Sequence, residues 1–170
     1  MKGKWATGIP PRNFTWIIRD RLALSERPGG FAPNHRRVRR QEELIWLRGQ
    51  GFTKVVSLLP SQHNLQAYED ERLGYAHYPL TPGVDPRSVL VDAYQDIDAS
   101  VRAGDQILVH QEELGERVMG VAAGYLVWSR RVPAQPQAIA LVEHLLGHQM
   151  GSGGRELVVV AAALPPRQPV

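Results

Sequence analysis

The sequence predicts an α/β protein, a three-layer α/β/α sandwich with a mostly parallel central sheet of four or five strands. Two observations support this prediction. Short apolar runs of the kind found in buried strands recur along the chain. Segments with apolar residues at helical spacing lie between them, and strands that alternate with helices typically form parallel sheets covered on both faces.

Four segments are expected to contain strands. Residues 14–18 are aromatic and β-branched, and residues 54–59 form a short apolar run. Residues 75–80 and 106–110 are two further candidates. Residues 156–164 are apolar as well, but their periodicity fits a strand or a helix.

Helical spacing of apolar residues predicts helices at 36–48, 89–101, 118–128 and 136–146. Asn34 is a candidate cap for the first. Residues 61–72 are polar, with room for a helical turn or two, and prolines and a glycine make residues 81–86 a loop. The small residues of the third helix suit close packing through the middle of the fold: Gly120, Ala122, Ala123 and Gly124.

The chain of 170 residues is long enough for one well-filled core. We expect an irregular arm over residues 1–12 and a single domain over residues 13–165. Hydrophobic residues make up 43% of the chain, and we find no membrane span or signal-peptide core, so the expected location is the cytoplasm. The complete absence of cysteine excludes disulfides, cysteine zinc sites and any cysteine nucleophile.

Charge is distributed unevenly along the chain. Residues 1–60 hold 12 Lys and Arg against 4 Asp and Glu, whereas residues 61–120 hold 4 against 11. The two regions are expected to face each other or to be solvated, and steering of an acidic partner is the alternative. The strongest basic run is Arg36, Arg37, Arg39 and Arg40, which is most simply a solvated helix face with local ion pairs.

The most informative segment joins a predicted buried strand to a predicted apolar helix. Residues 107–118 read ILVHQEELGERV, with His110 and Arg117 seven positions apart. This spacing resembles the His-Cys-x-x-Gly-x-x-Arg-Ser/Thr loop of the cysteine-dependent protein tyrosine phosphatases. Residues 13–23, NFTWIIRDRLA, and residues 51–58, GFTKVVSL, are similar to the opening and the first core strand of small atypical dual-specificity phosphatases.

The resemblance implies a phosphatase-like fold and an anion-binding loop. In that family the cysteine thiolate attacks phosphorus, backbone N–H groups and a helix N-terminus hold the phosphate oxygens, and the arginine clamps them. The corresponding loop here consists of His110, Gln111, Glu112, Glu113, Leu114, Gly115, Glu116 and Arg117.

The departures from the motif argue against the family's reaction. Gln111 stands at the nucleophile position, and an amide provides no thiolate. Thr81 stands where the resemblance places the general acid, with Asp85 as a possible substitute if the loop shifts. Leu114 replaces the loop glycine, and Val118 replaces the auxiliary hydroxyl.

These observations favour a catalytically inactive phosphatase-like protein that acts in signalling, binding a partner protein or a phosphorylated ligand near Gln111–Arg117 or at the basic helix. One alternative is an enzyme of different chemistry that uses Glu112, Glu113 or Glu116 as acid/base groups, with His110 behind them. Another is a basic-patch binder of nucleic acid or an acidic partner, although the run lacks the interleaved aromatics typical of nucleic-acid sites.

Arg117 is expected either to bind an anion or to form an internal salt bridge with Glu112, Glu113 or Glu116. No cofactor or metal is expected; His110 with Glu112 and Glu113, and the pair His144 and His148, are the weak metal candidates.

Overall fold

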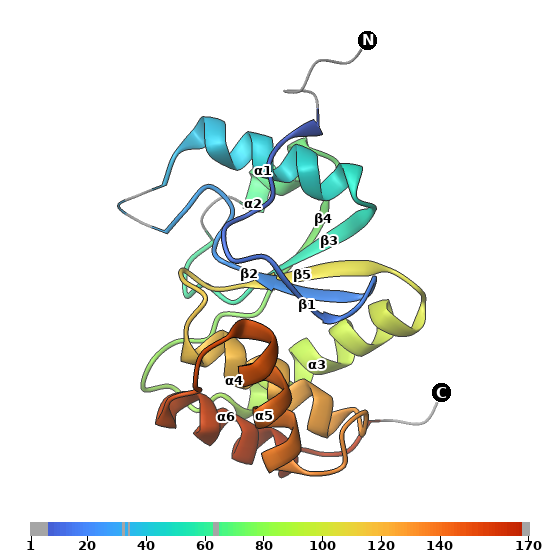
Figure 1. Ribbon diagram of the computed structural model, residues 1–170, viewed down its shortest axis with the longest axis vertical. Helices are drawn as coiled ribbons and strands as arrows, with labels where there is room; N and C mark the ends of the chain where they lie inside the picture. The colour runs from blue at the N-terminus through green and yellow to red at the C-terminus, as the bar shows by residue number, and fades with distance from the viewer. Residues whose placement is uncertain (1–6, 32, 34, 63–64, 168–170) are drawn as a thin grey trace.

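The computed structural model describes residues 7–31, 33, 35–62 and 65–167, and the structural statements below concern these residues. Asn34, the expected helix cap, and residues 1–6 of the expected arm lie outside them. One five-stranded sheet forms the middle layer, with two helices on one face and four on the other (Figure 1). The three-layer α/β/α architecture predicted from the sequence is therefore confirmed.

The sheet consists of β1 (Thr15–Ile18), β2 (Leu22–Ser25), β3 (Phe52–Ser57), β4 (Gly74–His77) and β5 (Gln106–His110). Their spatial order is β1-β2-β5-β3-β4. Only the edge strand β1 runs antiparallel to its neighbour; β2, β5, β3 and β4 are parallel. The sequence indicated the other four strands but not β2.

The helices are α1 (Arg37–Gly49), α2 (Leu65–Asp70), α3 (Arg87–Arg102), α4 (Glu116–Trp128), α5 (Gln135–Leu146) and α6 (Ser152–Ala162). The ambiguous segment 156–164 is thus largely helical. The cap position of α1 is Arg36, which has extended backbone angles and makes no side-chain capping bond. No described helix is long and apolar enough to cross a membrane.

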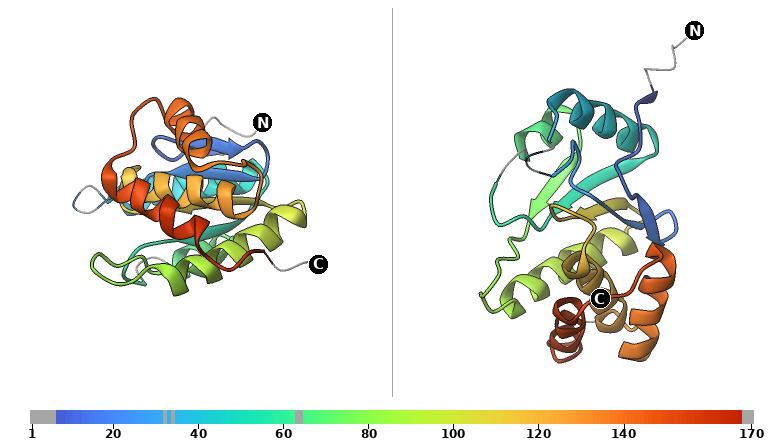
Figure 2. Two further views of the ribbon diagram at one scale, coloured as in Figure 1. Left: turned by 90° about the horizontal axis from the view of Figure 1, so that it is seen from below. Right: turned by 60° about the vertical axis from the view of Figure 1, so that its left-hand side comes forward.

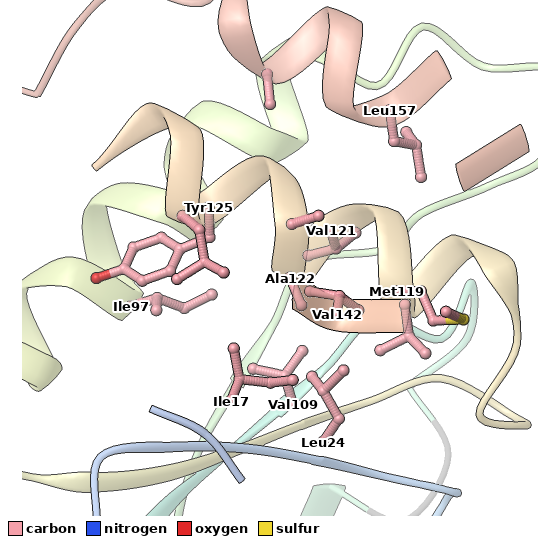
Figure 3. Close-up of a cluster of buried hydrophobic side chains, with 14 of the residues drawn as sticks. Ile17, Leu24, Ile97, Val109, Met119, Val121, Ala122, Tyr125, Val142 and Leu157 are labelled. Atoms are coloured by element: carbon pink, nitrogen blue, oxygen red, sulfur yellow. The ribbon is translucent and has the colours of Figure 1, made fainter. Parts of the chain in front are cut away.

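Side chains along each strand point alternately to the two faces of the sheet, so the buried residues form two hydrophobic clusters. Ala23 and Leu108 contribute to the smaller cluster under α1 and α2, whereas Leu24 and Val109 contribute to the larger one with the other helices (Figure 3). Neighbouring residues of a strand point to opposite faces of a sheet. Burial on both faces explains why these strands are apolar without interruption.

Helix α4 lies at the centre of the larger core, and every residue from Val118 to Trp128 except Val127 is buried. Its glycines allow a close approach to α6. A Cβ at Gly120 would lie 2.7 Å from the Cα of Gly154, and one at Gly124 would lie 2.7 Å from the Cβ of Ala161. The close packing expected of these small residues is confirmed.

Candidate functional site

The carboxyl ends of β2, β5 and β3 meet at one edge of the sheet, where ligands of open parallel sheets usually bind. The segment 111–115 leaves β5 at this edge and leads into the N-terminus of α4 (Figure 1). The structure therefore brings residues 110–117 into the strand–loop–helix arrangement that the sequence predicted.

The loop presents a row of backbone donors. Among the described residues, the N–H groups of residues 113–118 donate no hydrogen bond, and the first bond of the helix runs from Met119 N–H to the Gly115 carbonyl at 3.2 Å. The first N–H groups of any helix lack intrahelical acceptors and favour anions. Gly115 caps the helix with φ −107°, a conformation open to any residue, and a Cβ there would meet nothing within 4 Å.

His110 is a fully buried anchor of this loop. Its Nδ1 lies 2.9 Å from the Gln111 carbonyl, and its Nε2 lies 3.0 Å from the Tyr68 hydroxyl. A carbonyl only accepts, so Nδ1 carries the proton and Tyr68 donates to Nε2. Burial lowers the pKa of His110 to about 4. The imidazole is therefore a neutral, hydrogen-bonded core group that holds the start of the loop.

Arg27 is a site residue that the sequence did not indicate. It follows β2, its side chain is 7% exposed, and its Nη1 lies 3.2 Å from Oε1 and 3.4 Å from Oε2 of Glu112. Its backbone N–H also donates to the Glu112 carbonyl at 3.1 Å. The Nε of Arg27 is buried and has no hydrogen-bond partner among the described residues. Nothing local in the turn around Pro28 signals this contact, because the partners lie 85 positions apart.

Arg117 does not form the internal salt bridge that the sequence made possible. Within the described ranges its guanidinium has no carboxylate within 4.0 Å, and Glu112 pairs with Arg27 instead. Arg117 and Glu116 line a cavity of about 400 Å³ together with Pro82, Val84 and the α6 residues Leu157 and Val160. The motif arginine therefore remains available at the end of the loop.

Residues 82–86 lie beside this cavity, the place that the resemblance gives to the general-acid loop. Asp85, however, is absent from the cavity wall. Its carboxylate accepts the Arg87 N–H at 3.1 Å and pairs with the Arg87 side chain at 3.4 Å, both side chains being mostly exposed. Thr81 is half-buried, and its carbonyl accepts the Val84 N–H. Asp85 thus serves as a local turn partner at the start of α3.

None of the three loop glutamates is buried. The Glu112 side chain is 45% exposed, and Glu113 and Glu116 are exposed. The Glu116 carboxylate lies against the first turn of α6, where a side chain at Gly151 or Gly153 would collide with it. A carboxylate is favourable at a helix N-terminus. This arrangement offers no buried acid or base for the alternative enzyme chemistry.

The basic run on α1 is not one solvated face. Arg36 and Arg37 are exposed as expected, but Arg39 is 21% exposed and lies 2.7 Å from Glu43 and 3.9 Å from Glu26, both buried. Burial and neighbouring arginines lower the pKa of Arg40. Arg39 and Glu43 form a local ion pair of the kind that the sequence predicted. The partial burial of Arg39 and Arg40 beside Arg27 corrects the expectation of a fully solvated face.

Burial raises the pKa of Glu43, although Gly29 N–H donates to its carboxylate at 2.5 Å. Burial, Arg27 and Arg40 lower the pKa of His35, which keeps this imidazole neutral next to the loop. No three His, Asp or Glu side chains gather in a metal-binding group among the residues described. His144 and His148 are both exposed.

This sheet order, with a loop running from the central strand into a buried helix, is the fold of the protein tyrosine phosphatases, including the dual-specificity phosphatases. No family model and no curated protein matches the chain. Solved structures of phosphatases match the chain. The phosphatase-like fold that the sequence resemblance implied is therefore confirmed.

Three of these structures show the extent of the likeness. Tk-PTP in its active form has a TM-score of 0.70 at 21% identity, over 88% of this chain and 96% of its own. The kinase associated phosphatase KAP, with its catalytic-site cysteine substituted by serine, has a TM-score of 0.71 at 19% sequence identity. The match covers 91% of this chain and 98% of KAP. Human DUSP28 has a TM-score of 0.67 at 20% sequence identity, and the match covers 92% of this chain and 97% of DUSP28. At these identities the likeness establishes the fold.

Proposed function

We propose that this chain is a phosphatase-fold protein that does not hydrolyse phosphate esters by the cysteine route and instead binds a phosphorylated ligand or partner at the rim of residues 111–117. The observation that carries the proposal is Gln111, which directly follows β5 and precedes the row of free backbone donors. A neutral amide cannot attack phosphorus and leave again as a thiolate does.

The segment beside the loop supports the same conclusion. Residues 82–86 border the cavity that Arg117 lines, but the only carboxylate of that segment, Asp85, is engaged with Arg87. A leaving alkoxide would find no general acid there. Both halves of the acid–nucleophile pair are therefore missing.

Features that would hold an anion are present. Residues 113–118 offer backbone N–H groups, and Arg117 adds a planar guanidinium able to hold two oxygens. A ligand held by Arg117 would lie in this cavity, where Pro82, Val84 and Leu157 provide apolar contacts for the group that bears the phosphate. Glu116 also lines the cavity and opposes the binding of an anion there.

Thermal-shift titration with inorganic phosphate and tungstate tests the proposal. At about 100 times its dissociation constant, a bound anion stabilises the fold by about 2.7 kcal/mol. We expect this stabilisation in the native chain and its loss in Arg117→Ala. Arg87→Ala is the matched control, because Arg87 is an exposed arginine outside the cavity wall.

An aryl phosphate turnover assay on the same proteins completes the test. We expect no hydrolysis that depends on Gln111 or Arg117. Turnover that disappears in Gln111→Ala or Arg117→Ala would overturn the inactive assignment. If an anion stabilised Arg117→Ala as much as the native chain, the anion would bind somewhere other than at this loop.

A further inference from the structure

The cavity that Arg117 lines is a groove between α6 and the segment 82–86. One face of α6 forms the first wall, because its lining residues recur at intervals of three and four: Gly153, Glu156, Leu157 and Val160. Residues 82–84 and Pro86 form the opposite wall. At 1.5 Å per residue, the α6 wall is about 10 Å long. The groove therefore has room for about three residues of an extended chain.

Charged groups occur in a fixed order along this groove. Helix α6 runs beside α4 (Figure 2, left), and Glu116 lies against Gly153 and Gly154 at the start of α6. Arg117, the next residue of α4, therefore lies at the end of the groove where α6 begins. Glu156 follows Gly153 by three residues, which is about 4.5 Å along the helix axis. A cation thus precedes an anion along the groove.

The rest of the wall is apolar and open to solvent. Val84 is 58% exposed, Pro82 is exposed as well, and Val160 is half-buried. Apolar side chains that meet at one surface mark binding sites more often than scattered ones do. Since Val160 lies one turn beyond Glu156, the apolar wall continues past the charged groups.

Arg117 and Glu156 have no ion-pair partner in the described part of the chain. Arg155, the basic neighbour of Glu156 in the sequence, pairs with Glu143 at 3.4 Å. Glu116 lines the groove too. A ligand with negative charge alone is therefore attracted by one cation and repelled by two carboxylates. A ligand that also carries a positive group gains an attraction in place of this repulsion.

We propose that the groove binds an extended phosphorylated peptide with a lysine or arginine two positions from the phosphorylated residue, and that Glu156 selects this cation. The inference rests on the proposed function, because Arg117 must hold the phosphate. Side chains two positions apart in an extended chain point to the same side and lie about 7 Å apart. The continuation of the apolar wall to Val160 favours a peptide over a small zwitterion.

Isothermal titration of the full chain with three phosphotyrosine peptides tests the inference. The peptides differ only at the positions two residues before and two residues after the phosphotyrosine, where all hold lysine, glutamine or glutamate. Substitution on both sides makes the result independent of the direction in which the peptide binds. At low ionic strength we expect the lysine peptide to bind about threefold more tightly than the glutamine peptide, and the glutamate peptide about threefold more weakly.

Glu156→Lys is the deciding variant, and it should invert the order so that the glutamate peptide binds best. Glu156 is an exposed residue of α6, and lysine and glutamate are similar helix formers, so the variant is expected to retain the fold. Glu69→Lys is the matched control. It makes the same change of charge at an exposed position of α2, on the other face of the sheet, and should keep the native order.

Equal binding of the three peptides, or the native order in Glu156→Lys, would overturn this inference. Arg117→Ala should weaken the binding of all three peptides even then, so the proposed function stands or falls separately. If no peptide binds, the inference fails, and stabilisation by inorganic phosphate that depends on Arg117 decides whether the loop holds an anion.

Discussion

At the level of single residues, His110 shows how a motif position can be kept for structure. The sequence places it beside the missing nucleophile, yet both of its ring nitrogens are used in buried hydrogen bonds to Tyr68 and Gln111. It therefore holds the beginning of the loop against the smaller core. This role requires neither the cysteine nor the reaction, which explains why the histidine is compatible with Gln111.

The burial of His110 predicts a pH-dependent stability. Its pKa is about 4 in the folded chain and near 6.5 when unfolded. Between these two pH values the unfolded chain binds a proton at His110 that the native state does not bind. The contribution of His110 to the free energy of unfolding is therefore fully present above pH 6.5 and is lost as the pH falls toward 4. The expected loss is about 3 kcal/mol. Urea unfolding from pH 7 to pH 4 measures it.

The variant His110→Gln should reduce the slope of unfolding free energy against pH in this window, whatever its own stability. His148→Gln, a change at an exposed histidine, should retain the native slope. An unchanged slope in His110→Gln would show that another group carries the titration.

At the level of elements, α4 and α6 form the tightest contact of the helical layer. The approach of Gly120 to Gly154 leaves no room for a methyl group. We expect Gly120→Ala to destabilise the fold by about 1–3 kcal/mol, because overpacking forces the two backbones apart. Chemical denaturation measures this loss.

Gly49→Ala is the matched control for this change. Gly49 also lies in a helix, and a Cβ there would meet nothing within 4 Å. Replacement by alanine should be neutral or stabilising by up to about 1 kcal/mol, because alanine is the better helix former. A Gly120→Ala variant as stable as Gly49→Ala would contradict the close contact.

Most elements were predictable because their patterns are local. Helical spacing marked α1, α3, α4 and α5, and apolar runs marked β3 and β5. The strand β2 was not predicted, since its four residues, Leu22–Ser25, are too few to show a period. They become a strand by pairing with β1 and β5, the latter more than 80 positions away.

The candidate site was predictable only in part. The loop 110–117 was evident because its spacing is local. The contact of Arg27 with Glu112 and the approach of Arg39 to Glu26 depend on segments that meet only in the folded chain. No local pattern in the sequence indicates contacts between such distant segments.

At the level of the whole molecule, ion pairs connect the basic first third of the chain to its acidic middle. Arg27 pairs with Glu112, and Lys54 pairs with Asp96, so two ion pairs connect these regions across the fold. This bears out the expectation that the oppositely charged regions face each other. Arg36 and Arg37 remain exposed, as expected for the solvated part of the patch.

The proposed function predicts that a single substitution does not confer phosphatase activity, because the departures from the phosphatase motif lie in several segments. We expect Gln111→Cys to show no aryl phosphate hydrolysis above the native chain. The segment to which the resemblance assigns the general acid would still hold Thr81, and Glu113 and Glu116 would still repel the substrate dianion. A steady-state assay from pH 5 to pH 8 measures this. Robust turnover by Gln111→Cys would mean that the rest of the loop is intact as a catalytic cradle.

The amide at position 111 also determines how this loop can respond to oxidants. A phosphatase thiolate is converted to a sulfenic acid by peroxide and recovered by reduction. An amide offers no sulfur to oxidise, and the chain contains no other thiol that could form a disulfide with it. Met119 and Met150, the sulfur atoms of the described core, are buried. The loop therefore has no thiol through which peroxide could modify it.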